Sequence, residues 1–453
     1  MSSTEKAKLL PELNLMDATL LVIGAVIGSG IFLTSGIIAG SLPSVPWILS
    51  IWVIGTLISL FGGLTFAELG AMLPEAGGQY VYLREAYGPF AGFMYGWTAF
   101  IITQTGGIAA LAVGFAEYLA HFIPVLGLDI TMIGFAGFSI SAGQLVALSS
   151  ILFLTIVNYY GIRSGSTLQN VMTVIKLLSI IILIVAGLFM VGSTESAGEV
   201  TARLPMPAGL PLISAIGLAL IAVLWTFDGW YAVNTVASEI KNVKKNLPLS
   251  LIIGITAIGV IYLLVNLFYV AALPLQEMSG VVRIGEKATT WALGATAGHL
   301  MSALILVSIF GCLSATIIFG PRIYYAMAKD GLFFEKFSTV HPRYHSPSVA
   351  ILWQGVIAGL LCLTGTYEQL FTYVTFAVLL FFEGNVVAVF VLRVKRPEAE
   401  RPYRVWGYPY VPAIFGVMIL VIMLSTVAER PVEALLGLIF IMIGLPVYFY
   451  WRK

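Results

Sequence analysis

The chain has 453 residues, of which 59% are hydrophobic and only 10% are charged, and its formal net charge is +1. Its mean hydropathy of +0.98 excludes an ordinary soluble domain, in which about 25% of residues are charged. Long apolar runs indicate an integral membrane protein built from helices rather than a β-barrel. Both cysteines, Cys312 and Cys362, lie in apolar runs, so no disulfide is expected.

Apolar segments of membrane-spanning length recur about twelve times along the chain. In order they cover residues 17–41, 46–72, 89–121, 141–161, 169–192, 211–238, 249–273, 293–327, 347–365, 369–394, 406–427 and 433–450. No signal peptide is expected, because Glu5 and Glu12 interrupt a basic leader and the first segment is too long.

Basic residues predict the orientation of these segments. With a cytoplasmic N-terminus, the outer loops hold only four bases, which are Arg203, Arg283, Lys287 and Arg430. The other loops and the tails carry all remaining bases except Lys176, which lies inside the fifth segment. This excess follows the positive-inside rule and places both termini in the cytoplasm of a multi-pass plasma-membrane protein.

A glycine-rich stretch, Gly24–Gly30, lies in the middle of the first segment and is a poor sequence for a continuous helix. In lipid, freed backbone groups are costly unless protein, water or a ligand satisfies them. Small residues also serve close helix packing. A break at mid-membrane favours a binding site, with N–H groups facing an anion and carbonyls facing a cation.

A second break is predicted at Trp225–Trp230 in the sixth segment, where Asp228 precedes Gly229. Interrupted helices five segments apart predict an inverted repeat with the binding site between its halves. The expected organisation is a tail at residues 1–16, a first five-helix repeat at 17–192, a second at 211–394 and two further helices at 406–450.

Ionisable and aromatic residues within the segments have alternative interpretations. Asp228 is either a cap for its own broken helix or a substrate or proton group. Trp225 either faces lipid or covers the site as a lid. Lys176 either snorkels to the interface or places its ammonium against the carbonyls of a broken helix. Glu383 is either a proton site or a structural, hydrogen-bonded acid.

Two further acids, Glu68 and Glu239, lie near predicted helix ends and are expected to form structural salt bridges. No cluster of histidine, cysteine and acidic residues has the pattern of a metal or hydrolytic site. We therefore expect no metal, no cofactor, no nucleic-acid partner and no enzymatic activity.

Several motifs occur in a consistent order over nearly the whole chain. They are Ile27–Phe32 (IGSGIF), Phe66–Gly70 (FAELG), Pro74–Tyr80 (PEAGGQY), Ser238–Glu239, Asn246–Pro248, Ser308–Gly311 and Arg396–Pro402. In this order the chain resembles the L-type amino acid transporter family of the amino acid–polyamine–organocation superfamily, in a prokaryotic member.

The resemblance implies a LeuT-type fold of two inverted five-helix repeats plus two helices, and a free amino acid as substrate. The N–H groups of Ser29 and Gly30 would hold the α-carboxylate. The carbonyls of Val26, Trp225 and Asp228 would hold the α-ammonium, with Trp225 as the gate.

Lys176 matches the lysine of the family's fifth segment. The resemblance implies that it bonds the carbonyl of Gly24 and the hydroxyl of Ser308, where sodium-coupled relatives hold sodium. That argues for sodium-independent transport.

The chain departs from the family in three places. Glycine is frequent in the family where Asp228 stands, and Glu383 has no counterpart. The cysteine that tethers a glycoprotein subunit in eukaryotic members, between the third and fourth segments, is absent. We therefore expect no disulfide-linked glycoprotein partner and a microbial source.

The leading functional hypothesis is a sodium-independent exchanger of neutral L-amino acids that works by alternating access. Acidic substrates are not expected, whereas Asp228 leaves cationic ones open. One alternative is a proton-coupled symporter with Lys176, Asp228 or Glu383 as the proton carrier. Another class, a membrane amino acid sensor, is disfavoured by the short terminal tails.

Overall fold

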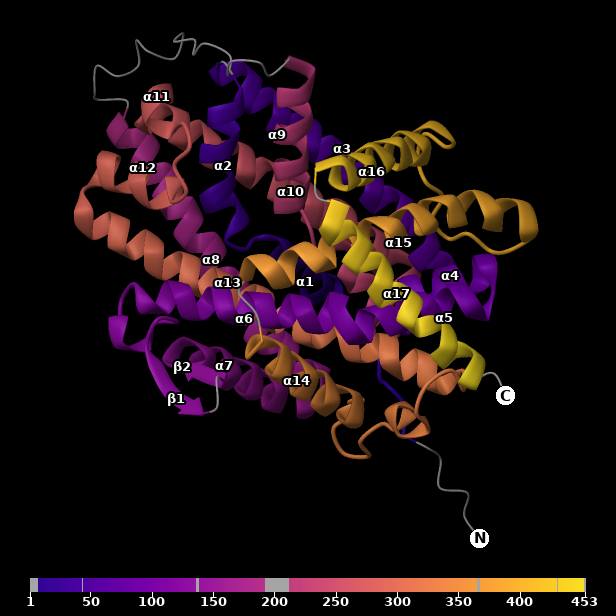
Figure 1. Ribbon diagram of the computed structural model, residues 1–453. Helices are drawn as coiled ribbons and strands as arrows, with labels where there is room; N and C mark the ends of the chain where they lie inside the picture. Colours follow the sequence, from indigo (N-terminus) through magenta and orange to yellow (C-terminus); the bar gives the residue numbers. More distant parts are fainter. Residues whose placement is uncertain are drawn as a thin grey trace.

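The structure is a computed structural model that describes residues 7–42, 44–135, 138–191, 212–364, 367–429 and 431–451. Figure 1 shows a bundle of helices with one small hairpin at its edge. Its first half contains α1 Leu15–Val26, α2 Gly30–Ser41, α3 Val45–Met72, α4 Gln79–Tyr87, α5 Pro89–Thr98, the π-helical turn η1 Ala99–Thr103, α6 Gln104–Ala120, η2 Pro124–Leu126, β1 Thr131–Phe135, β2 Phe138–Ser141, α7 Ala142–Tyr159 and α8 Ile162–Val191. Its second half contains α9 Leu212–Thr226, η4 Trp230–Glu239, α10 Val243–Ala272, α11 Leu275–Met278, α12 Ile284–Leu293, α13 Ala295–Lys329, η5 Glu335–Ser338, α14 Ser348–Cys362, α15 Tyr367–Lys395, α16 Tyr410–Glu429 and α17 Pro431–Trp451.

Membrane-spanning helices account for most of the described chain. Ten are long and apolar enough to cross a bilayer, and the bent pair α1 and α2 makes an eleventh. The shorter apolar helix α14 stands where the ninth segment is predicted. The predicted class, an all-α membrane protein, is therefore confirmed.

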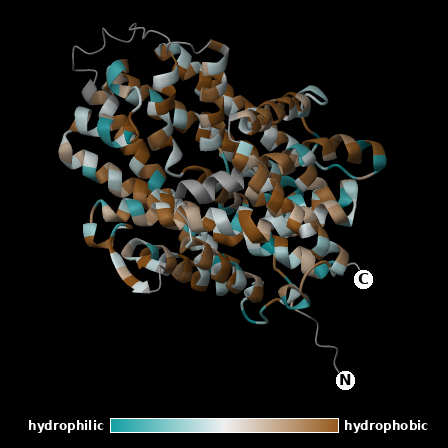
Figure 2. Cartoon of the chain, in the orientation of Figure 1, coloured by the Kyte–Doolittle hydropathy of each residue, from teal (hydrophilic) through white to brown (hydrophobic). Residues whose placement is uncertain are grey.

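Large apolar side chains cover the outside of the bundle. Exposed residues on α8 include Leu178, Ile182 and Phe189, and α17 exposes Leu435 and Ile443. Hydrophobic residues predominate along the helices in Figure 2. Such surfaces are too extensive for a water-soluble monomer and suit contact with lipid.

The broken helix α1 lies near the centre of Figure 1, where it contacts α8, α10, α13 and η4. Two pairs of long helices flank it, because α3 packs against α10 and α6 packs against α13. The last two helices lie on the periphery, where α16 contacts α3 and α17 contacts α5, and both contact α15. Segments from both halves of the chain therefore surround the break in the first helix.

Several details differ from the sequence predictions. The fifth segment starts earlier than residue 169, at Ile162, and the hairpin β1–β2 and the short helices α4, α11 and α12 were not anticipated. Helix α1 begins at Leu15, two residues before the predicted start of the first segment at residue 17. Asn14 caps α1 through a reciprocal bond with Asp17.

The end of the predicted tail is part of the packed structure. Leu13 is buried and donates its N–H to the Glu239 carbonyl, and its own carbonyl accepts from Lys241. Residues 192–211, which join the two predicted repeats, lie outside the described residues.

The two expected structural salt bridges are present. Buried Glu239 accepts from Arg322 at 2.7 and 3.0 Å, which joins the end of η4 to α13. Buried Glu68 on α3 accepts from Arg393 of α15 at 2.9 and 2.6 Å. These bidentate pairs neutralise charges that would otherwise be costly to bury.

Candidate functional site

The first helix is broken where the glycines predict it. Helix α1 ends at Val26, Ile27 is extended with φ −71° and ψ 92°, and α2 starts at Gly30 with a bend of 46° between the two. A helix end leaves backbone groups without intrahelical partners. Ser29, the N-cap of α2, makes no side-chain capping bond. The start of α2 therefore presents N–H groups, together with the positive end of a helix dipole.

Lys176 binds the carbonyl groups that this break frees. Its ammonium, fully buried on α8, donates to the carbonyls of Gly24 at 3.1 Å and Ile27 at 2.5 Å. A third contact, at 3.4 Å, is to the carbonyl of Ser308 on α13. The interpretation of Lys176 as a snorkelling residue is therefore wrong, because the ammonium points inward at α1.

The expected bond between Lys176 and the Ser308 hydroxyl is corrected by this geometry. The hydroxyl donates toward α1 instead, with Ile27 at 2.9 Å and Gly28 at 3.3 Å as acceptors. Lys176 and Ser308 thus share the Ile27 carbonyl. Both side chains hold the break from behind, on α8 and α13.

The second break separates α9, which ends at Thr226, from η4, which begins at Trp230. Gly229 has φ +107°, a conformation that side chains other than glycine rarely adopt, and a Cβ there would lie 3.1 Å from the Ala25 carbonyl oxygen. Glycine is thus needed for the turn and for its close approach to α1.

Tyr262 of α10 connects the two breaks. Its hydroxyl lies 3.2 Å from the Val26 carbonyl at the end of α1 and 3.1 Å from the Thr226 carbonyl at the end of α9. Its ring packs edge-on against Trp52 and Phe227, with centroid separations of 5.5 and 5.0 Å. One buried side chain therefore bridges both broken helices.

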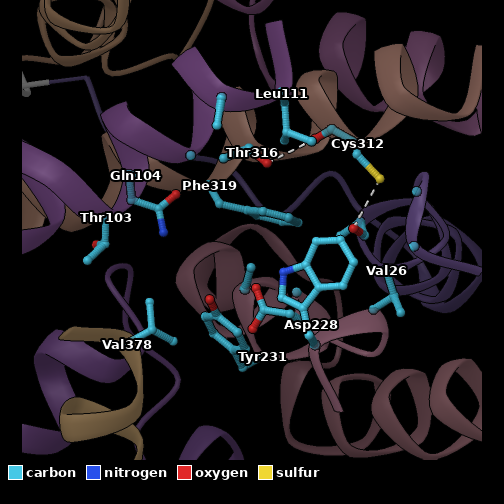
Figure 3. Close-up of a pocket in the computed structure, with 18 of the residues that line it drawn as sticks. Val26, Thr103, Gln104, Leu111, Asp228, Tyr231, Cys312, Thr316, Phe319 and Val378 are labelled. Atoms are coloured by element: carbon cyan, nitrogen blue, oxygen red, sulfur yellow. Dashed lines mark hydrogen bonds between the residues drawn. The ribbon is translucent and has the colours of Figure 1, made fainter. Parts of the chain in front are cut away.

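A cavity of about 160 Å³ lies between the breaks. Its lining comes from the breaks themselves and from α6, α13 and α15, as follows: Ala25, Val26, Gly28, Ser29, Gly30, Thr103, Gln104, Gly107, Ala110, Leu111, Trp225, Thr226, Asp228, Gly229, Tyr231, Ala232, Cys312, Thr316, Phe319 and Val378. Figure 3 shows Gln104 on one side, Val26 and Cys312 on the opposite side, and Asp228 with Tyr231 along a third.

The cavity brings together the residues predicted to bind substrate, which are Val26, Ser29, Gly30, Trp225 and Asp228. The predicted cation-substitute residues Lys176, Gly24 and Ser308 meet behind the first break. Glu383 is elsewhere. It lies on α15 outside the cavity lining, and a Cβ added to Gly416 of α16 would be 3.5 Å from its Oε1.

The charge of the cavity is simple. Among the described residues that line it, Asp228 is the only charged one, and its side chain is exposed to the cavity. The N-cap residue of η4 is Gly229, which as a glycine has no side chain that could cap the helix. The described part of the chain holds no group of three or more histidine, cysteine and acidic side chains placed to bind a metal ion.

Trp225 stands between this cavity and a second, more apolar one. The second cavity, of about 110 Å³, is bordered by α3, α9, η4, α15 and α16, and it shares Trp225, Asp228 and Val378 with the first. An indole between two cavities can open or close the passage between them by changing rotamer.

Sequence reasoning missed three contributors. Tyr262 and Cys312 gave no signal beyond a general apolar pattern, although Cys312 is four residues after Ser308 and so lies on the same helix face. Its thiol lies 3.2–3.4 Å from the carbonyls of α1. Gln104 could have been found, because a polar amide within the third apolar segment is unusual in a membrane.

Comparison with known proteins gives a consistent picture. A family described as "Amino acid permease" matches residues 13–445. The serine/threonine exchanger SteT of Bacillus subtilis (strain 168) is 31% identical over 99% of both chains. The human b(0,+)-type amino acid transporter 1 is 30% identical, over 97% of this chain and 87% of its own length. The human large neutral amino acids transporter small subunit 2 is 29% identical, over 97% and 81% respectively.

Proposed function

Because this chain belongs to the amino acid permease family and is an amino acid transporter rather than an enzyme, we propose that it exchanges neutral L-amino acids across the plasma membrane by alternating access. The observation that carries the proposal is the cavity between the two broken helices. It combines helix N–H groups, freed carbonyls and one carboxylate within about 160 Å³. This combination suits a small zwitterion.

The amino acid backbone binds at the two breaks. The first N–H groups of α2, at Ser29 and Gly30, hold the α-carboxylate, because a helix N-terminus favours an anion. The α-ammonium lies against the carbonyls of Val26, Trp225 and Asp228. Tyr262 positions the first of these by its contact with the Val26 oxygen.

Neutral side chains are preferred for an electrostatic reason. A second carboxylate would approach Asp228, the only charged residue among the described lining, with no base in that lining to offset it. Two of the relatives are named for neutral substrates, since one is a serine/threonine exchanger and another a large neutral amino acids transporter subunit.

Sodium is not required, because Lys176 already supplies a positive charge. The carbonyls that face its ammonium, from Gly24, Ile27 and Ser308, are the type of group that binds an alkali cation at a broken helix. A second cation at the same carbonyls would be repelled.

We propose the cytoplasm for both termini, following the distribution of basic residues. The inverted repeats are assigned to 17–192 and 211–394, and the packing of α3 on α10 and of α6 on α13 supports this pairing. The transporter acts without a disulfide-linked glycoprotein, since Cys312 and Cys362 are both buried.

The test is uptake of radiolabelled alanine into proteoliposomes, with and without unlabelled alanine inside. An exchanger accumulates label only when the lumen contains amino acid. Competition by excess external serine and glutamate follows in the same vesicles, and serine but not glutamate is expected to compete.

Proton symport is the second candidate, because Asp228 is accessible within the cavity. If an inward proton gradient drives uptake into vesicles that contain no amino acid, the protein is a symporter rather than an exchanger. Equal competition by glutamate and serine would contradict the neutral preference, and the absence of uptake of any amino acid would contradict transport itself.

A further inference from the structure

Gln104 is a polar residue of the cavity that the binding of an amino acid backbone does not use. Its side chain is nine-tenths buried, its Oε1 has no hydrogen-bond partner, and it lines the cavity opposite Val26. We propose that the Gln104 carboxamide recognises the substrate side chain and selects a hydroxyl group there, so that serine and threonine bind better than alanine and valine. This inference rests on the proposed function.

The local backbone places Gln104 at the cavity. The turn before it, Ala99–Thr103, is π-helical, and the Gln104 N–H donates to the Ala99 carbonyl five residues back. One extra residue in a turn rotates everything after it by about 100° around the helix axis. Thr103, Gln104, Gly107, Ala110 and Leu111 consequently form the face that lines the cavity.

This π-helical turn is supported by hydrogen bonds from two side chains, one of them on another helix. The Tyr324 hydroxyl of α13 donates to the Ala99 carbonyl at 3.3 Å, and the Thr105 hydroxyl donates to Phe100 at 3.0 Å. Turns of this kind are rare and occur frequently at functional sites. The surrounding structure thus maintains a costly local geometry whose effect is to present Gln104 to the cavity.

A hydroxyl is the group that fits an amide best. The carboxamide offers both an acceptor and donors, and a hydroxyl can donate and accept at once. Leaving a buried polar atom unpaired is costly, so a methyl group in the same place is disfavoured. The hydroxyl of Thr316, also in the cavity, already donates to the Cys312 carbonyl at 2.9 Å. Among the described residues that line the cavity, Gln104 is the only carboxamide.

The cavity also offers apolar surface. Leu111, Phe319 and Val378 supply apolar walls for the carbon atoms of a substrate side chain. Threonine and valine have nearly the same shape and differ in one hydroxyl. Their comparison isolates the hydrogen bond from the effect of volume.

The experiment measures inhibition of alanine exchange by threonine, valine, serine and glycine in proteoliposomes. Wild-type protein is expected to prefer threonine to valine about tenfold, the value of one good buried hydrogen bond. The variant Gln104→Met keeps the length of the side chain without its polar atoms. It is expected to bring the two inhibitors to within about twofold.

Gln354→Met is the matched control. Gln354 is likewise buried with an unpartnered Oε1, but it lies on α14 outside the cavity and its amide donates to Ile317. Its variant should keep the wild-type preference. If a bound water rather than the substrate satisfies Gln104, the Gln104→Met and wild-type preferences will be equal, and the proposal is overturned.

The outcomes separate this inference from the proposed function. Absence of exchange in wild-type protein contradicts the function. Exchange of alanine with equal inhibition by threonine and valine contradicts only the role of Gln104, even if Gln104→Met fails to fold. Loss of the threonine preference in both Gln104→Met and Gln354→Met would assign it to general packing and would also overturn the inference.

Discussion

At the residue scale, Gly30 has no room for a side chain. A Cβ there would lie 3.0 Å from Cγ2 and 3.3 Å from Cα of Thr226, on the other broken helix. Gly30→Val should therefore push α2 away from α9 at the expected carboxylate site. We expect at least about a tenfold loss of substrate affinity, measured as the concentration of alanine that half-saturates exchange.

Gly217→Val is the control for this change. Gly217 lies on α9, and a Cβ there would meet no atom within 4 Å. It carries the same helix penalty for valine without the contact at the break. Wild-type affinity in a correctly inserted Gly30→Val protein would mean that the carboxylate binds elsewhere.

Substitution of Lys176 tests whether its ammonium takes the place of a bound cation. Removing the ammonium by Lys176→Ala takes one donor and its positive charge away from the Gly24 and Ile27 carbonyls, in a fully buried place. We expect the exchange rate to fall by about tenfold or more, with half-saturation changed much less, because the lysine touches the break rather than the cavity.

The control for Lys176 is Lys287→Ala, which removes a lysine paired at the surface with Glu277 at 2.7 Å. Exposed ion pairs contribute little, so this variant should exchange normally. A Lys176→Ala protein with normal turnover would show that the charge has no part in the cycle.

At the element scale, Tyr262 holds two broken helices together by one hydroxyl. Tyr262→Phe keeps the ring against Trp52 and Phe227 but removes the donor shared by the Val26 and Thr226 carbonyls. We expect a stability loss of about 1 kcal/mol, read as a lower unfolding temperature in detergent, together with slower exchange.

Tyr269→Phe is the comparison on the same helix. The Tyr269 hydroxyl is buried without a hydrogen-bond partner, so its removal should be neutral or stabilising. Equal effects of the two substitutions would show that the bridge between the breaks contributes nothing.

Substitution of Trp225 tests whether this side chain acts as a gate at the second break. Because this indole borders both cavities, Trp225→Ala should connect them and impair closure over the substrate. We expect the exchange rate to fall several-fold more than the binding affinity, with Trp225→Phe in between. Equal losses of rate and affinity would identify Trp225 as an ordinary wall of the cavity.

Sequence patterns determine the elements only in part. The two helix breaks could be predicted directly from their glycines. At Gly229, for example, φ is +107°, a conformation that other residues rarely adopt. The π-helical turn at Ala99–Thr103 has no such signature, since its stability includes a contact from Tyr324, more than two hundred positions away. Likewise, the direction of the Ser308 hydroxyl depends on the position of α13 relative to α1, which no local pattern fixes.

At the scale of the whole molecule, coupling ions can be tested with imposed gradients. Because Lys176 supplies the charge at the carbonyls of Gly24 and Ile27, replacing sodium by choline on both sides should leave exchange unchanged. Uptake under an inward sodium gradient, in vesicles without internal amino acid, is the sensitive measurement. Accumulation there would contradict the cation-substitute role.

The global architecture was predictable from the lengths of the apolar runs, because a bilayer requires about 20 residues per helix. The pairing of the breaks followed from their spacing, and Ser29 and Asp228 do meet in one cavity. The remaining wall was not predictable, since Gln104, Cys312 and Val378 come from three helices that are brought together only by packing. The sequence thus anticipates where the backbone of a ligand binds better than what surrounds its side chain.

The bridge at Tyr262 has a consequence for the kinetics of the empty protein. Its hydroxyl has a single hydrogen to donate, yet the hydroxyl oxygen lies within 3.2 Å of two carbonyl oxygens. Cys312 has one thiol hydrogen near the carbonyls of Gly24, Ala25 and Ile27, and Lys176 also donates to the first and the last of these. The Val26 and Thr226 carbonyls of the cavity lining therefore share one hydroxyl hydrogen, whereas an incoming ammonium brings three hydrogens. When the protein changes conformation without a bound substrate, these carbonyl groups are short of hydrogen-bond donors in a medium of low polarity, which is costly. For the proposed exchanger, we therefore expect the loaded crossing to be faster than the empty one, so that release of one molecule awaits arrival of the next.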